Sequence, residues 1–374
     1  MMYKVLHILS SFAGGISSFV LNKALFLKDK DVIFDTISFH APDQRQRQII
    51  EATGGKCTVV SIPTKDGFSK FFHELNQYFS NNKNYEMVDC HLIDHQALPF
   101  YLVAKKHNIK RFNLHAHSTL GSFGKLKRKL RFALNNSIAD QKISCGSLVT
   151  KAVFGEKALK NNEVMHIPNS INAKAFINAE PSKNTVLEKL RKDKDLIIGQ
   201  VGRMTPNKNY SFTIKLAEKI KSENKNWALV FVGSGEQEAA LKEEVEAKNL
   251  EDYIIFLGRQ SSMPEIYQSF DRLLLPSLKE GYPTTIVESQ AAGVPAIVSD
   301  TVTKEVDLNL GLVEFRPIEE SQIDLWVDTI AKDFPIPDQE KRYKTLSMHK
   351  LTNSASAKLY YNFLTGKISH YNML

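Results

Sequence analysis

Residues 272–299 read RLLLPSLKEGYPTTIVESQAAGVPAIVS and indicate a strand, a polar loop, a helix and a second strand. The apolar runs Arg272–Leu275 and Ala296–Ser299 each have the length of a buried strand, and Gly293 is a natural end for the helix between them. Two consecutive strands joined by a helix are typical of a parallel sheet. Glu280 then lies on the loop at the carboxyl end of the first strand, where open α/β sheets bind ligands.

The start of this helix has two interpretations. Thr285-Ile-Val-Glu288 matches a capping box, with Thr285 as the N-cap and the Glu288 side chain reaching back to it. This interpretation gives Glu288 a purely structural role at the start of the helix. It does not explain Glu280 or the exposed amides from Gly281 to Thr285, which we expect to form a polar nest suited to sugar or ribose hydroxyls.

The same alternation of short strands and longer helical stretches runs through both halves of the chain. A length of 374 residues favours two domains, and the segment His166-Ile-Pro-Asn-Ser-Ile-Asn172 separates them. The expected strands of the first half are Tyr3–Leu9, Val32–Phe39, Cys57–Ser61, Met87–Cys90, Arg111–His115 and Lys142–Ser144. Those of the second half are Leu196–Val201, Ala228–Val232, Ile254–Leu257, Arg272–Leu275 and Ala296–Ser299.

The composition indicates a globular protein with an anionic partner. The net charge is +8 and the pI is about 9.1, which favours nucleic acid, an anionic membrane surface or phosphorylated small molecules as partners. Three well-separated cysteines predict neither disulfides nor a zinc site, and hence a reducing, cytoplasmic setting. No apolar run approaches the ~18 residues of a membrane span.

Five cations crowd the stretch 125–131. Leu126, Leu130 and Leu134 recur among them at helical spacing, as on an amphipathic helix that lies on a membrane surface. An ordinary core-packing helix with a solvated basic face explains the pattern equally well.

Glycine-containing turns follow several of the expected strands. Gly14-Gly15 follows the first expected strand. Gly202-Arg203 follows the strand Leu196–Val201, and Lys208-Asn209 opens the helix after it, so that Arg203 and Lys208 flank one strand-to-helix loop. Such loops are well placed to neutralise a diphosphate, although structural turns and solvated cations have the same appearance. Gly233-Ser-Gly235 lacks the third glycine of a dinucleotide fingerprint, so a nicotinamide site is not expected.

Histidines 115 and 117 end one strand, and strand alternation puts both rings on one face. A metal pair completed by His91 or His95 is one reading, but no carboxylate–histidine cluster of recognised spacing supports it. We therefore expect no metal. A ring that hydrogen-bonds a ligand and a plain strand-end histidine remain the alternatives.

Taken in order, these motifs make the chain resemble the family 4 glycosyltransferases of the GT-B fold, especially those of bacterial capsule and exopolysaccharide biosynthesis. The resemblance runs from Val5 to about Gly366. Its motifs are the Gly14-Gly15 loop, His117, Ile167-Pro-Asn-Ser-Ile-Asn172, Gly202-Arg203 with Lys208-Asn209, Gly233-Ser-Gly235, and Glu280-Gly-Tyr-Pro with Glu288. The family usually has Gly and Asp where this chain has Ser170 and Asn172, a change in a structural joint.

The resemblance implies two Rossmann-like domains facing across a cleft. Residues 1–168 would form the acceptor-side domain, residues 169–348 the nucleotide-sugar domain, and residues 349–374 a helix returning to the first domain.

The resemblance also implies a role for each site residue. Arg203 and Lys208 would grip the donor diphosphate, Glu280 would hold the transferred sugar, and His117 would contact that sugar from the other domain, with His115 as its substitute. The implied donor-binding set is Gly14, Gly15, Gly202, Gly233, Gly235, Arg259, Gly281, Tyr282, Pro283, Thr284 and Glu288, and His91 and His115 are the acceptor-side candidates.

The implied reaction is transfer of a hexosyl or N-acetylhexosaminyl group, with retention and without metal or other cofactor, from a nucleotide-diphosphate sugar such as a UDP-sugar. A saccharide or lipid-linked saccharide would accept it, with Lys125–Arg131 docking on the inner membrane face and no nucleic acid bound. The alternatives are a non-catalytic scaffold for another transferase and a nucleotide-sugar epimerase on the same fold.

Overall fold

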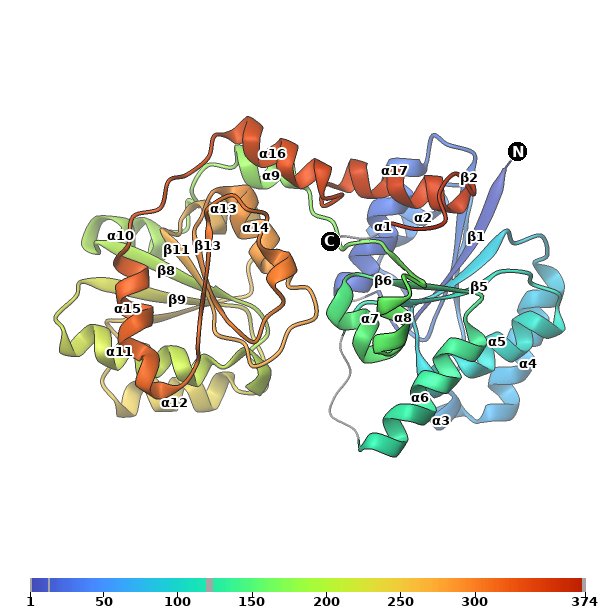
Figure 1. Cartoon of the computed structure of the whole chain (residues 1–374), viewed down its shortest axis with the longest axis horizontal. Coiled ribbons are helices and arrows are strands. Elements are labelled where there is room, and N and C mark those ends of the chain that lie inside the picture. The colour runs from blue at the N-terminus through green and yellow to red at the C-terminus, as the bar shows by residue number, and fades with distance from the viewer. Residues whose placement is uncertain (1, 13, 119–123, 372–374) are drawn as a thin grey trace. The chain divides into compact units, whose positions relative to one another are not determined.

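The computed structural model describes residues 2–12, 14–118 and 124–371 and consists of two compact units (Figure 1). Unit 1 is made of residues 1–170 and 353–374, and unit 2 of residues 171–352. The sequence-based boundaries lie after residues 168 and 348. Among the described residues, no helix has both the length and the apolar character that a membrane span requires.

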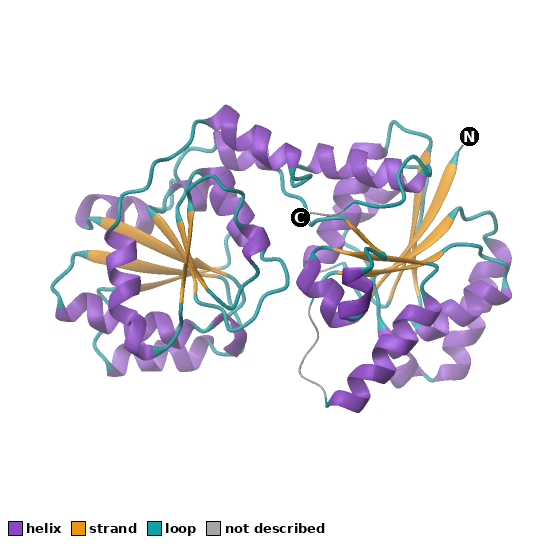
Figure 2. Cartoon of the chain, in the orientation of Figure 1, coloured by secondary structure: helices purple, strands orange, loops and turns teal. Residues whose placement is uncertain are grey.

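Unit 1 is built on a seven-stranded parallel sheet in the order β3-β2-β1-β4-β5-β6-β7, with helices on both faces (Figure 2). Its strands are β1 (Tyr3–Leu9), β2 (Val32–Ser38), β3 (Cys57–Val59), β4 (Met87–Cys90), β5 (Phe112–Ala116), β6 (Gln141–Ser144) and β7 (Val164–His166). Its helices are α1 (Gly15–Leu27), α2 (Gln44–Glu51), α3 (Pro63–Asp66), α4 (Phe68–Asn81), η1 (Asp94–Gln96), α5 (Leu98–Lys106), α6 (Lys125–Ile138), α7 (Ser147–Val153), α8 (Glu156–Lys160) and α17 (Asn353–Leu364).

Unit 2 has a six-stranded parallel sheet in the order β10-β9-β8-β11-β12-β13. Its strands are β8 (Leu196–Val201), β9 (Trp227–Val232), β10 (Ile254–Gly258), β11 (Arg272–Leu275), β12 (Ala296–Ser299) and β13 (Val313–Arg316). Its helices are α9 (Ala173–Asn178), α10 (Thr185–Asp193), η2 (Pro206–Lys208), α11 (Tyr210–Ser222), α12 (Glu238–Ala247), α13 (Met263–Gln268), α14 (Thr284–Ala292), η3 (Lys304–Val306), η4 (Glu320–Gln322), α15 (Ile323–Ala331) and α16 (Gln339–Met348).

Helix α17 belongs to unit 1, although unit 2 separates it from the rest of that unit in the sequence. It packs against α1, and its Tyr360 and Phe363 are buried in the same apolar cluster as Val5 and Phe34 of the central strands. Residues from the end of the chain therefore complete the core of unit 1, as the family resemblance implies.

Candidate functional site

Two loops at the carboxyl edge of the unit 2 sheet are tied together. They follow the adjacent strands β8 and β11, and Lys208 Nζ lies 2.7 Å from Glu280 Oε1 across them. The Asn207 side-chain amide donates to the Lys279 carbonyl oxygen at 2.6 Å, and Asn209 Nδ2 donates to the Pro276 carbonyl oxygen at 3.1 Å. The structure thus brings together Lys208 and Glu280, which lie 72 positions apart in the sequence.

Arg203 and Lys208 both lie on the loop that follows β8, but their side chains differ in exposure and in partners. Its side chain is exposed and makes no hydrogen bond or ion pair with the described residues, whereas Lys208 is already paired with a carboxylate. No carboxylate of the described residues therefore offsets the charge of Arg203.

The glycines of the β9 loop are required by close packing against the β8 loop. Gly233 has φ +135°, and a Cβ atom there would lie 2.0 Å from the Gly202 carbonyl oxygen. A Cβ atom on Gly235 would lie 2.2 Å from the Met204 carbonyl oxygen. These contacts fix the backbone beside Arg203, and Arg259, after β10, joins the same edge through a 2.6 Å hydrogen bond to Ser234 Oγ.

The predicted capping box of α14 is wrong. The helix begins at Thr284, its N-cap is Pro283, and no side chain caps it. Glu288 instead accepts a 2.8 Å hydrogen bond from the Tyr267 hydroxyl, because Tyr267 lies buried on the neighbouring helix α13. Burial raises the pKa of the Glu288 carboxyl, while Tyr267 and Lys208 act in the opposite direction. The predicted end at Gly293 is confirmed, with φ +79° at the C-cap.

The start of α14 presents polar groups to the Glu280 loop. The first-turn amides of a helix have no partner within it, and Gly281 precedes this turn together with the buried Tyr282 and Pro283. The hydroxyl oxygens of Ser277 and Thr285 are buried without a hydrogen-bond partner among the described residues. Unsatisfied buried hydroxyls are uncommon, so this edge is suited to a polar ligand.

The predicted residues of unit 1 gather at the carboxyl edge of its own sheet. Gly14 and Gly15 follow β1 and are exposed, His91 follows β4, and His115 and His117 stand at the end of β5. Since β1, β4 and β5 are adjacent, the three histidines meet, and the ring centroids of His115 and His117 lie 4.3 Å apart. The prediction that both rings share one face is confirmed. His115 is completely buried, and only His117 of this pair is partly exposed.

Hydrogen bonds link these rings in a row. His7 Nδ1 lies 2.9 Å from His91 Nε2, His91 Nδ1 lies 2.8 Å from His117 Nε2, and His117 Nδ1 lies 3.1 Å from Asn169 Oδ1. Burial lowers the pKa of His7 to about 4 and holds the pKa values of His91 and His117 well below their ordinary value. The three rings are therefore neutral at pH 7.

The same cluster has the composition of a metal site. His91, His115 and His117 place one ring nitrogen each within 4.8 Å of the others, and so do His7 and His91 with a carboxylate oxygen of Asp89. The hydrogen bonds of the row already use the facing nitrogens of His91 and His117, whereas His115 Nε2 is buried without a partner among the described residues. His95 does not join this cluster.

A buried lysine lies beside these rings. Lys23 of α1 is completely buried, and its Nζ donates to Ser356 Oγ at 2.7 Å and to Ser170 Oγ at 3.4 Å. No carboxylate of the described residues pairs with it, and burial lowers its pKa to about 7.

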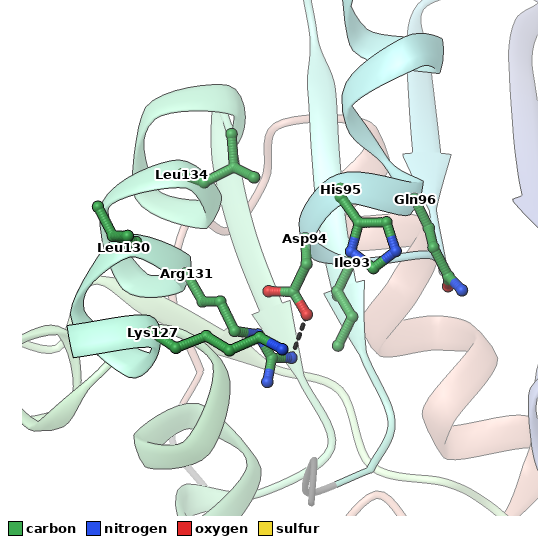
Figure 3. Close-up of a pocket in the computed structure, with 8 residues that line it drawn as sticks. All are labelled: Ile93, Asp94, His95, Gln96, Lys127, Leu130, Arg131 and Leu134. Carbon is green, nitrogen blue, oxygen red and sulfur yellow. Dashed lines mark hydrogen bonds and ion pairs between the residues drawn. The ribbon is translucent and has the colours of Figure 1, made fainter. Parts of the chain in front are cut away.

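Helix α6 carries the basic stretch and is only partly covered. Leu126 and Leu130 are 73% and 63% exposed, so at these two positions the helix does not pack as a core helix would. Figure 3 shows a pocket of about 340 Å³ between α6 and η1, with Arg131 pointing to Asp94, its ion-pair partner. The pocket is lined by Ile93, Asp94, His95, Gln96, Lys127, Leu130, Arg131 and Leu134.

Sequence reasoning missed several residues that surround the predicted ones. His7, Asp89 and Lys23 look like ordinary members of apolar elements, and only the fold shows that they meet. Tyr360 donates to Asp89 Oδ2 at 3.0 Å from a helix 271 positions away, for which no local signal exists. His7 offers a clue, as a histidine within the apolar run from Val5 to Leu9.

Known proteins resemble this chain in sequence over both units. Residues 182–309 match the family described as "Glycosyl transferases group 1". The Bacillus subtilis protein named "Putative glycosyltransferase EpsF" is 29% identical over 88% of this chain and 87% of its own length. The Escherichia coli enzyme named UDP-Gal:alpha-D-GlcNAc-diphosphoundecaprenol alpha-1,3-galactosyltransferase is 34% identical over 36% of each chain.

The fold also matches solved structures. Anabaena HepE, crystallised in complex with UDP and glucose, superposes with a TM-score of 0.74 over 97% of this chain and all of that one, at 15% identity. At that identity the likeness concerns the fold, which is GT-B.

Proposed function

We propose that this chain transfers a hexosyl or N-acetylhexosaminyl group from a UDP-sugar, with retention. The acceptor would be a saccharide or a lipid-linked saccharide. The proposal rests on the GT-B fold and on the match of residues 182–309 to the group 1 glycosyltransferases. The product would belong to polysaccharide biosynthesis. Support comes from EpsF, from the galactosyltransferase named for a diphosphoundecaprenol-linked acceptor, and from HepE with UDP.

The observation that carries this proposal is the polar edge of unit 2. Arg203 is exposed and uncompensated there, and the Lys208–Glu280 pair lies beside the unsatisfied hydroxyls of Ser277 and Thr285. A diphosphate needs cations and amides at one place, and a sugar needs hydrogen-bond acceptors next to them.

The chemistry follows from where charge develops. As the sugar leaves, negative charge grows on the diphosphate, and fixed cations stabilise that charge more in the transition state than in the ground state. We assign this role to Arg203 and Lys208, which makes a metal ion unnecessary. Glu280 would hold sugar hydroxyls. Glu288, fixed by Tyr267, would hold the ribose.

In unit 1, we assign the amides of Gly14 and Gly15 and the ring of His117 to the substrates. His91 and His115 were acceptor-side candidates. Their burial argues for a role behind His117 instead of direct contact with an acceptor.

Helix α6 would dock on an anionic membrane surface to reach a lipid-linked acceptor. Its exposed Leu126 and Leu130 would enter the headgroup layer, and the neighbouring cations would meet lipid phosphates.

The donor site is tested by Arg203→Ala. We expect turnover with the accepted UDP-sugar to fall by about 10²–10³-fold, the usual loss for one transition-state donor, and UDP affinity measured by calorimetry to fall as well. Lys192→Ala, an exposed cation of α10, should change neither quantity.

Glu280→Gln separates the two roles of the pair. It removes the counter-charge of Lys208, so UDP should bind as tightly as before or more tightly, while turnover should fall because the sugar contact is weakened. Wild-type protein that binds neither UDP nor GDP would contradict the proposed enzyme and favour a scaffold. Isomerisation of a nucleotide-sugar without acceptor would favour an epimerase.

A further inference from the structure

The row of hydrogen bonds behind His117 has a direction. Asn169 Oδ1 lies 3.1 Å from His117 Nδ1, and with the side-chain amide in this orientation the oxygen accepts and His117 Nδ1 carries the proton. A neutral imidazole has one N–H group, and His117 Nε2 is therefore an acceptor that takes the proton of His91 Nδ1.

The same reasoning extends one ring further. His91 donates through Nδ1, so its Nε2 accepts from His7 Nδ1 at 2.9 Å. At the far end, the Tyr360 hydroxyl lies 3.4 Å from His7 Nε2 and donates to Asp89 at 3.0 Å.

We propose that His91, held by His7, is a positioning residue that keeps His117 in the tautomer with its proton on Nδ1. The proposal rests on the assignment of His117 to the sugar. In this tautomer His117 offers a donor to the ligand, and a sugar oxygen takes the place of Asn169 as the acceptor of that proton. His117 is partly exposed and Asn169 lies in the joint segment, so this bond is the one a ligand reaches.

His115 follows the same principle through a different partner. Its Nδ1 lies 3.3 Å from Asp89 Oδ2, and a carboxylate fixes the proton on that nitrogen just as a neighbouring acceptor does for the other rings. Its stacked ring at 4.3 Å limits rotation of His117, so orientation and tautomer are set by separate neighbours.

The first experiment needs no variant. Long-range ¹H–¹⁵N spectra of ¹⁵N-labelled protein at pH 7 distinguish a protonated Nδ1 from a protonated Nε2, and His117→Gln assigns the signals. We expect the Nδ1–H form for His117. The Nε2–H form would overturn the proposal. One equivalent of metal bound in the wild type and lost in His115→Ala would also overturn it, since a metal held by His91, His115 and His117 would take ring nitrogens that the row uses for its hydrogen bonds.

The second experiment uses two variants of His91. In His91→Leu the acceptor nitrogen of His117 loses its donor, so we expect mixed tautomers and a fall in kcat/KM of about two- to tenfold. His91→Gln has a donor and an acceptor on one side chain and should restore the Nδ1–H signal and most of the rate. His73→Gln, on the exposed face of α4, is the control.

The two proposals fail in different ways. A His91→Leu protein with the wild-type His117 signal and the wild-type kcat/KM would show that His91 does not set the tautomer of His117. A protein that shows the expected tautomers but transfers no sugar supports the positioning role of His91 and contradicts the proposed function.

Discussion

Lys23 is a buried charge whose partners are two hydroxyl groups. A native pKa of about 7 against 10.5 for the exposed amine means that folding opposes its protonation. We expect Lys23→Met to raise the free energy of unfolding of unit 1 by about 1–3 kcal/mol at pH 6, because a buried polar group without an ionic partner is replaced by an apolar one of similar length.

The gain should shrink towards pH 10, since the native amine is then neutral and the cost of burying it falls. Thermal unfolding at pH 6 and pH 9 measures the difference, and Lys28→Met, on an exposed residue that follows the same helix, is the matched control. A loss of stability in Lys23→Met at pH 6 would show that its hydroxyl partners outweigh the burial of the charge.

Single residues also show how far the sequence predicts the site. The motifs lead to Arg203, Lys208, Glu280 and His117, because each follows a strand whose carboxyl end is recognisable. They give Glu288 the wrong local partner, since a capping box is a local pattern while Tyr267 arrives from another helix. A local sequence pattern cannot predict contacts between residues that only the fold brings together.

At the scale of elements, the eleven predicted strands all have counterparts, because buried parallel strands are continuous apolar runs. The two strands that were not predicted, β7 and β13, lie at the edges of their sheets. β7 has only three residues, and β13 reads Val-Glu-Phe-Arg without a buried side. The partly buried β13 carries a weaker apolar signal, whereas β7 is buried but too short to stand out in the sequence.

Helix α6 is the element on which the membrane hypothesis depends. Each lysine or arginine near an anionic surface contributes about 1 kcal/mol, so neutralising Lys127, Arg128 and Lys129 together should weaken vesicle binding by about 10²-fold. Sedimentation with vesicles of anionic lipid at low and at high salt measures this, and high salt should mimic the variant.

The apolar contribution is tested separately with Leu126→Asp, which should weaken vesicle binding further. Leu102→Asp is the control, because Leu102 is also exposed in unit 1, at 53%, but lies on α5. Equal vesicle binding by wild type and by the triply neutralised protein would exclude α6 as the docking element.

At the scale of the whole molecule, the two units should respond differently to acid. His7, His91 and His117 are buried in unit 1 with lowered pKa values, whereas unit 2 contains only His349, which is partly exposed. Unfolded histidines bind protons below about pH 6.5 and native His7 only near pH 4. Stability of unit 1 is thus highest above pH 6.5 and falls towards pH 4, by on the order of 1 kcal/mol per pH unit for each such ring.

Two probes follow the units separately. Both tryptophans, Trp227 and Trp326, are buried in unit 2, so their fluorescence reports on that unit alone. We expect the unfolding transition seen by far-UV circular dichroism to separate from the fluorescence transition between pH 7 and pH 4.5. His91→Gln should reduce the separation, and coincident transitions at every pH would contradict the expectation.

The placement of α17 has a consequence for how the protein is made. On the ribosome, the strands of unit 1 emerge first, unit 2 follows as one uninterrupted stretch, and residues 353–364 come after both. Until that helix leaves the exit tunnel, the nascent first unit lacks Tyr360 and Phe363 and presents uncovered apolar surface of α1 to solvent. Unit 2 is therefore able to fold during synthesis, whereas unit 1 can complete its core only after α17 has emerged.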